Sequence, residues 1–129
     1  MSVETPLNLI SSNRSLYDIL WECDESALTT NVCKSMLVAL PNVERYSAFD
    51  VIIRNSVSST STSRILLIND LPAQYEYTVG GGTTRSEYRT VRVISNGLRF
   101  GDVYKWGAIH TPSNNLQLCC YPLLIYGIR

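Results

Sequence analysis

The C-terminal stretch 116–129 constrains the fold most, because it is apolar on both faces of an extended strand. Successive side chains of a strand point to opposite faces. One face carries Leu116, Leu118, Cys120, Pro122, Leu124, Tyr126 and Ile128, and the other carries Cys119, Tyr121, Leu123 and Ile125. A strand without a polar face must be covered on both sides, so we expect a central strand of a layered β fold, or a strand shared between subunits. Pro122 cannot donate a ladder hydrogen bond, which predicts a bulge or a free edge there.

The chain before this stretch divides into short extended segments separated by turns. Alternation is clearest at 46–54, and it predicts a half-buried strand. Asn96-Gly97 is a strong hairpin signal between strands expected at 85–95 and 98–106. The other strands are expected at 15–22, 34–40, 64–69 and 74–79, with 64–69 short and buried. A helix is the alternative for 33–40, although it would be short and uncapped.

About eight strands without a convincing helix predict an all-β fold, either an antiparallel β-sandwich or a jelly-roll-like barrel. Residues 1–14 are mostly polar and contain Pro6, which indicates an N-terminal arm or linker. Residues 15–129 are then a single domain, long enough to bury a core of its own.

Charge and composition exclude several classes of partner. Eleven acidic and eleven basic residues give a formal net charge of zero, so no electrostatic field draws the chain to nucleic acid or to anionic lipid. No apolar run has membrane length and the first residues do not form a secretion signal, so we expect synthesis and folding in a cytoplasm. Charged residues make up only 17%, against about 25% in typical soluble domains, which favours a surface reserved for another protein. The chain has nine Arg and two Lys. This excess of Arg is typical of an interface, but arginines scattered over the surface explain it equally well.

The four cysteines do not form a metal-binding motif in the sequence. Cys119 and Cys120 are adjacent, so in a strand they point to opposite faces and cannot both bind one metal ion. We therefore expect no metal site and no cofactor, and interpret the cysteines as buried thiols in a reducing compartment. A Cys23–Cys33 bridge across a hairpin is the alternative.

No arrangement of residues suggests catalysis. His110 is the only histidine, it lies in a loop at 107–115, and neither a serine elbow nor a suitably spaced acid accompanies it. A solvent-exposed loop histidine is its ordinary interpretation. Acidic residues cluster only at Glu22, Asp24 and Glu25, where a turn would leave them solvated. The chain is therefore expected not to be an enzyme.

Aromatic residues near one loop are the better sign of a binding site. Tyr104, Trp106 and His110 flank the loop at 107–115, and aromatic faces beside a few polar groups are typical of sugar-binding sites and protein interfaces. These three residues are the candidate ligand-binding residues. Core packing explains Trp106 equally well.

Two segments resemble bacteriophage proteins. Asn96-Gly-Leu-Arg-Phe-Gly101, a polar loop, and Cys120-Tyr-Pro-Leu-Leu-Ile-Tyr-Gly-Ile-Arg129 are similar to the ends of tail-fibre and receptor-binding-protein head modules. Those modules often close on a hairpin, a Gly-rich loop and a Pro-x-x-Ile-Tyr-Gly-Ile-Lys/Arg terminus. Leu20-Trp21, followed by Leu40, Tyr46 and Phe49-Asp-Val-Ile-Ile53, resembles the start of the same module. The resemblance spans 15–129 and implies a β-sandwich that assembles as a homotrimer on a virion and contacts glycans or proteins of the host surface.

The expected function follows from this resemblance. The chain would be a non-enzymatic virion protein, made in the host cytoplasm, with itself, other virion proteins and a host surface glycan as partners. Head modules usually follow a shaft, and only 1–14 precede the first expected strand here. The alternative is therefore a capsid decoration, cement or head-fibre protein that binds the coat protein rather than a host ligand.

Overall fold

The structure is a computed structural model that describes residues 16–57, 60–70, 73–80 and 86–129. The arm predicted at 1–14 lies outside the described residues. Ten strands and four short 3₁₀ helices make up the described chain. None of the described helices combines the length and the apolar character needed to cross a membrane.

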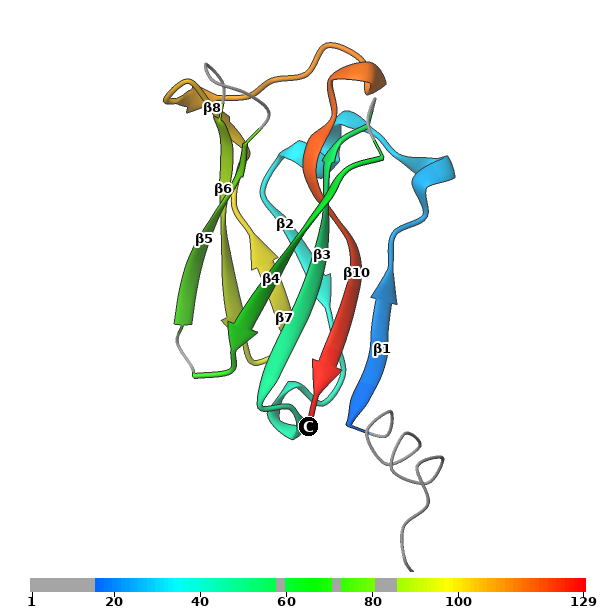
Figure 1. Cartoon of the computed structure of the whole chain (residues 1–129), viewed down its shortest axis with the longest axis vertical. Coiled ribbons are helices and arrows are strands. Elements are labelled where there is room, and N and C mark those ends of the chain that lie inside the picture. The colour runs from blue at the N-terminus through cyan, green and yellow to red at the C-terminus, as the bar shows by residue number, and fades with distance from the viewer. Residues whose placement is uncertain (1–15, 58–59, 71–72, 81–85) are drawn as a thin grey trace, which may run out of the picture.

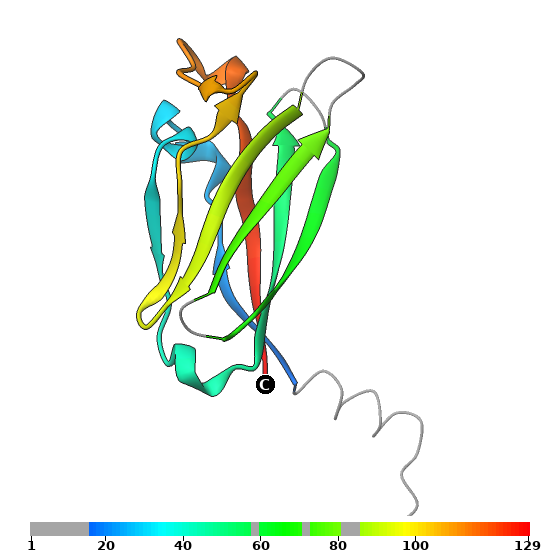
Figure 2. The same ribbon diagram turned by 90° about the vertical axis from the view of Figure 1, so that its left-hand side faces the viewer.

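The strands form two antiparallel sheets that face each other (Figures 1 and 2), which confirms the predicted all-β sandwich. The four-stranded sheet has the order β1-β10-β3-β4, built from β1 (Tyr17–Glu22), β10 (Cys119–Ile128), β3 (Ala48–Ser56) and β4 (Thr62–Ile68). The second sheet has the order β2-β7-β6-β8-β9, with β5 paired to β6 as well. Its strands are β2 (Met36–Ala39), β5 (Ala73–Gly80), β6 (Ser86–Ile94), β7 (Gly97–Phe100), β8 (Tyr104–Lys105) and β9 (Ala108–Ile109). The predicted strand at 34–40 is confirmed over its larger part, and its helical alternative is wrong.

One hydrophobic core fills the space between the sheets. The four-stranded sheet contributes Phe49, Val51, Ile53, Leu67 and Ile125, and the second sheet contributes Val38, Val91, Val93, Leu98 and Phe100. The inward residues of β3 are those that alternation in 46–54 predicts. Burial of this apolar surface is the main term that stabilises the fold.

β10 is a central strand, as the sequence predicts, since β1 and β3 flank it. Its pairing with β3 shifts register between Pro122 and Leu124, which confirms the bulge predicted at Pro122. The predicted start at Leu116 is wrong. Asn115–Gln117 form the 3₁₀ helix η4 instead, capped by the Asn114 side chain, and Leu116 is 78% exposed. Asn is a favoured residue for such a cap, which explains why the strand begins only at Cys119.

The hairpin predicted at Asn96-Gly97 is present, but its turn lies one residue earlier. Ile94 pairs with Gly97, so Ser95 and Asn96 occupy the turn. Gly97 is needed for a different reason, because a Cβ there would lie 2.1 Å from the carbonyl oxygen of Val38 on the neighbouring strand. The conformation is also one that favours glycine, with φ at +151°.

The strand expected at 98–106 is divided in two, which raises the strand number above eight. β7 ends at Phe100, and the backbone N–H of Gly101 turns to the carbonyl of Thr90. Val103 is fully buried and donates its backbone N–H to the carbonyl of Cys33. The chain then re-enters the sheet as β8, paired with Glu87 and Tyr88 of β6.

The strand predicted as buried at 64–69 is an edge strand with one open face. Leu67 is fully buried, whereas Leu66 and Ile68 are 55% and 50% exposed. A continuous apolar run conceals this alternation, because periodicity cannot be seen where every residue is hydrophobic.

The two ends of the sandwich hold different segments (Figures 1 and 2). η1 (Glu25–Ala27), η2 (Thr30–Cys33), η4 and the β8–β9 hairpin gather at one end. At the other end Arg129 donates its backbone N–H to the carbonyl of Leu16 at 2.9 Å. The segment at 107–118 therefore lies far from the C-terminus.

Candidate functional site

The three predicted site residues share the β8–β9 hairpin but do not converge on one ligand position. Lys105 pairs with Ala108, so Trp106 and Gly107 form a two-residue turn with φ of 56° and 76°. Positive φ at both central residues is typical of a type I′ turn. Trp106 is 64% exposed at this tip, so its interpretation as a core residue is wrong.

Tyr104 is a packing residue of the hairpin rather than an exposed one. Its ring stacks on Tyr88 of β6, with centroids 5.3 Å apart and an interplanar angle of 10°. Next to it, Lys105 pairs with Glu87 and places its ammonium group 5.4 Å from the centre of the Trp106 ring. The stack and the ion pair fix the base of the hairpin and leave its tip in solvent.

His110 lies at the base of the hairpin and is half-buried, so its interpretation as an exposed loop histidine is wrong. Its backbone N–H donates to the carbonyl of Val103 at 2.8 Å. Its ring atom Nε2 lies 2.8 Å from the carbonyl oxygen of Gln117 in η4. A carbonyl only accepts hydrogen bonds, so Nε2 carries a proton, and in the neutral ring Nδ1 carries the lone pair.

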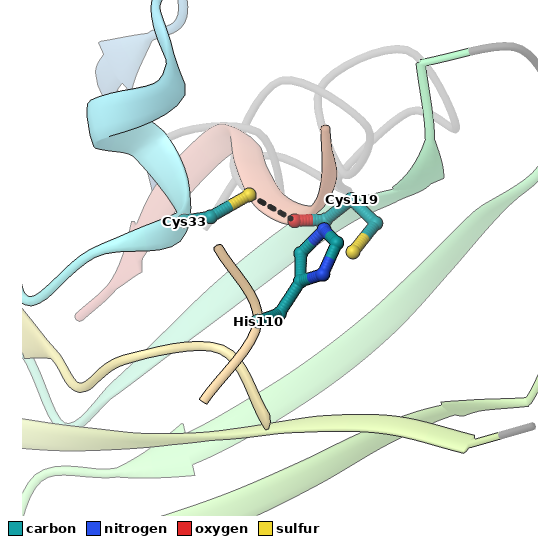
Figure 3. A group of neighbouring side chains, drawn as sticks. All are labelled: Cys33, His110 and Cys119. Carbon is teal, nitrogen blue, oxygen red and sulfur yellow. Dashed lines mark hydrogen bonds between the residues drawn. The ribbon is translucent and has the colours of Figure 1, made fainter. Parts of the chain in front are cut away.

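Two cysteines from distant segments surround this histidine (Figure 3). Cys33 ends η2, Cys119 begins β10, and their sulfur atoms and one ring nitrogen of His110 all lie within 4.8 Å of one another. Cys33 is fully buried and Cys119 nearly so. The Cys33 thiol lies 3.5 Å from the Cys119 carbonyl oxygen. Three soft donors from three segments thus meet at the loop end of the sandwich.

None of the four cysteines forms a disulfide, so the Cys23–Cys33 bridge is absent. Three of them are buried, as predicted, and Cys23 is half-buried. The pKa of the Cys33 thiol is raised, first by its hydrogen bond with Cys119 and then by burial. Hydrogen bonding with Cys120 and burial raise the pKa of Cys119 to about 12, although Cys33 acts in the opposite direction. Both thiols are therefore protonated at neutral pH in the absence of a bound cation.

A buried arginine holds the backbone beside both cysteines. Arg89 of β6 is fully buried and donates to the carbonyls of Lys34 at 2.7 Å, Cys120 at 3.1 Å and Gly101 at 2.6 Å. Its guanidinium carbon lies 5.4 Å from the centre of the Phe100 ring. Within the described part of the chain no carboxylate forms an ion pair with Arg89. The guanidinium therefore contributes a buried positive charge close to Cys33.

A second notable surface is the outer side of the four-stranded sheet. We call it the open face and define it by its exposed and half-buried apolar residues Tyr17, Ile19, Leu66, Ile68, Leu124, Tyr126 and Ile128. The strand register places them on one side, with rows through Tyr17, Ile128 and Ile68 and through Ile19, Tyr126 and Leu66. Large apolar residues gathered on one face of a soluble domain mark an interaction surface.

Two charged groups in the middle of the open face form an ion pair with each other. Asp50 of β3 lies between Tyr126 and Leu66 in the register and is nearly buried. Its carboxylate accepts two hydrogen bonds of 2.9 Å from Nε of Arg64. Further along β10, Tyr121 is covered by η1, and its hydroxyl donates to Glu25 at 2.9 Å. The open face is therefore bounded at the loop end and apolar in its middle.

Sequence reasoning missed both of these features. Cys33 and Cys119 are 86 residues apart in the sequence, and their approach to His110 depends on the sandwich topology. Exposure of Leu66 and Ile68 depends on β4 being an edge strand. One sequence signal pointed to the open face. The stretch 116–129 is apolar on both faces of a strand, which predicts either a central strand or a strand shared between subunits.

No protein-family model, curated protein or solved structure matches this chain.

Proposed function

We propose that this chain is a non-enzymatic virion module that assembles with copies of itself through the open face and presents the Trp106 hairpin to a partner. The open face carries the proposal. β10 is apolar on both sides, and only its inner side is covered by the second sheet. A second copy of the chain would supply the missing cover.

Self-association suits this surface better than a charged partner does. Its middle holds apolar side chains and the Asp50–Arg64 ion pair, so this part of the surface offers little charge to a partner of either sign. Interfaces between identical subunits are typically the most apolar ones. The resemblance of 96–101 and 120–129 to tail-fibre heads favours three copies.

The position of the Trp106 hairpin suits contact with a host ligand. The hairpin lies at the end opposite to Leu16, where the chain enters β1 (Figure 1). A module attached to a virion near Leu16 would point this end outward. Trp106 is exposed and has a positive φ, which is an unfavourable backbone conformation for a tryptophan. Residues in such conformations concentrate at functional sites. Surface saccharides are the partner class that an exposed aromatic ring favours.

A capsid decoration protein is the second candidate. It would use the same open face for self-association, whereas its hairpin end would meet the coat protein rather than a host glycan. The low content of charged residues is consistent with either partner.

Light scattering on the purified chain tests the assembly. We expect the mass of a trimer for the wild type and of a monomer for Leu66→Lys, because a lysine cannot be buried in the apolar interface without a partner. Leu37→Lys is the matched control, since Leu37 is an exposed leucine of the second sheet and its replacement should preserve the trimer. A monomeric wild type, or equal effects of the two variants, would refute assembly through the open face.

Binding assays separate the two candidates. A receptor-binding head attaches to host cells and loses attachment in Trp106→Ala, while remaining a trimer. A decoration protein ignores cells and binds virions that lack it. Retention of cell binding by Trp106→Ala would exclude the hairpin tip as the contact.

A further inference from the structure

We propose that Sγ of Cys33, Sγ of Cys119 and Nδ1 of His110 bind one zinc ion that ties the two sheets together at the loop end. This inference is independent of virion assembly and of the open face. It revises the expectation of no metal site, which considered Cys119 only together with Cys120.

The donor set selects the metal class. Thiolate and imidazole are soft or borderline ligands that suit zinc, whereas calcium and magnesium require oxygen ligands. Tetrahedral zinc, with Zn–S of about 2.3 Å and Zn–N of about 2.0 Å, places neighbouring donors about 3.5 to 3.8 Å apart. The two sulfur atoms and one ring nitrogen of His110 lie within 4.8 Å of one another, so contraction by about 1 Å through side-chain rotation forms the site. Three protein ligands leave the fourth position for water or another ligand.

The histidine is already oriented for this role. Nε2 donates to the Gln117 carbonyl at 2.8 Å, which leaves the lone pair on Nδ1. Metal-binding histidines almost always donate their second N–H to a carbonyl or carboxylate, which fixes the ring and its tautomer. Gln117 is held in turn, because its side-chain oxygen accepts hydrogen bonds from the N–H and hydroxyl of Ser113. The loop 111–117 thus positions the imidazole.

The two thiols are positioned by Arg89. Its guanidinium binds the carbonyls of Lys34 and Cys120, the residues that directly follow Cys33 and Cys119. It therefore fixes the backbone on both sides of the site. Two thiolates balance the charge of a zinc ion.

The site would add a metal link between parts of the fold that packing and the hydrogen bonds of Arg89 already join. Cys119 belongs to the four-stranded sheet, whereas Cys33 precedes β2 and His110 follows β9 in the second sheet. His110 is half-buried, so an ion can enter from the hairpin side. Zinc would thereby anchor the hairpin that carries Trp106.

Titration of the reduced, chelator-treated full chain tests the site. With cobalt(II) as the spectroscopic probe, we expect one ion per chain, with visible bands of tetrahedral thiolate ligation that zinc abolishes and magnesium does not. Cys33→Ser and Cys119→Ser should weaken binding at least a hundredfold and lose the thiolate bands. Cys23→Ser is the matched control, since Cys23 lies outside the cluster, and it should bind as the wild type does.

A measurement on the wild type alone guards against variants that fail to fold. Zinc at stoichiometric amounts should raise the melting temperature and protect two of the four thiols from a thiol reagent. Absence of stoichiometric binding, equal loss in Cys23→Ser and Cys33→Ser, or formation of a Cys33–Cys119 disulfide that zinc does not prevent would overturn the proposal.

Discussion

The two ends of the sandwich differ in the kinds of side chain that they bring together. At the C-terminal end, Asp18 accepts a hydrogen bond of 2.8 Å from the Tyr46 hydroxyl and two hydrogen bonds of 2.9 and 3.0 Å from Nη2 of Arg129. At the loop end, two thiols and an imidazole meet beside a buried cation, and Trp106 occupies a strained turn. The first end is held by hydrogen bonds among its own side chains, although Oδ1 of Asn69 is buried there without a partner. The second end holds groups whose chemistry suits a ligand.

The loop end should depend on a single side chain. Arg89→Met would leave three carbonyls without their donor and remove a buried charge that β2, β6, β7 and β10 surround. We expect the free energy of unfolding to fall by about 3 kcal/mol, measured by urea denaturation. Arg92→Met on the exposed side of the same strand is the control and should change the free energy by less than about 0.5 kcal/mol. A similar fall in the free energy of unfolding in both variants would show that the hydrogen bonds of Arg89 do not stabilise the loop end.

The C-terminal end should be sensitive to volume instead. A Cβ added at Gly127 would lie 2.6 Å from the Tyr46 ring and 2.8 Å from a methyl group of Leu20. Gly127→Ala is expected to cost about 2 kcal/mol of stability through overpacking. Gly107→Ala at the hairpin tip meets no atom within 4 Å but has φ of +76°, so it should cost about 1 kcal/mol from strain alone. A larger loss of stability in Gly107→Ala than in Gly127→Ala, measured by urea denaturation, would contradict this difference between the ends.

Acid should weaken the C-terminal end. Hydrogen bonds from Arg129, and then from Tyr46, hold the pKa of Asp18 below its usual value of 3.8. The native state therefore releases this proton more readily than the unfolded state, so the stabilisation is present above about pH 4 and is lost as the pH falls below it. In Arg129→Gln the decline of the urea midpoint between about pH 5 and pH 2 should be shallower. Exposed Arg99→Gln should follow the wild-type profile, and a steeper decline in Arg129→Gln would be inconsistent with this pairing.

The smallest effect is expected at the hairpin tip. Trp106→Asn keeps the positive φ with a residue that tolerates it, so the free energy of unfolding should rise by about 0.5 kcal/mol. Thermal or urea unfolding can resolve the sign. A loss above about 1 kcal/mol would mean that Trp106 supports the fold in spite of its exposure.

Much of the fold could be predicted from local patterns. Alternation at Phe49, Val51 and Ile53 identifies β3 and its inward face, and Asn96-Gly97 locates the β6–β7 hairpin to within one residue. Pro122 predicts the bulge of β10 because a missing donor has the same effect in any sheet. These features depend on neighbouring residues only.

The features that were missed depend on topology. Nothing near Leu66 shows that β4 ends a sheet. Cys33 meets Cys119 and His110 only because η2 and β9 end, and β10 begins, on the same side of the sandwich. The split of 98–106 follows from a tertiary hydrogen bond, between Val103 and Cys33. Tyr104, Trp106 and His110 were correctly placed near one loop, whereas their different directions could not be predicted from spacing.

The hydrogen bond between Arg129 and Leu16 has a mechanical consequence. β1 and β10 are antiparallel neighbours whose ends meet there, with Tyr17 opposite Ile128. A force that separates Leu16 from Arg129 therefore breaks the hydrogen bonds between β1 and β10 one after another, starting at this end. A force between Leu16 and the Trp106 hairpin runs along the strands and loads the rungs of β1 and β10 together in shear (Figure 1). The sandwich should therefore resist tension along its length far better than separation of Leu16 from Arg129.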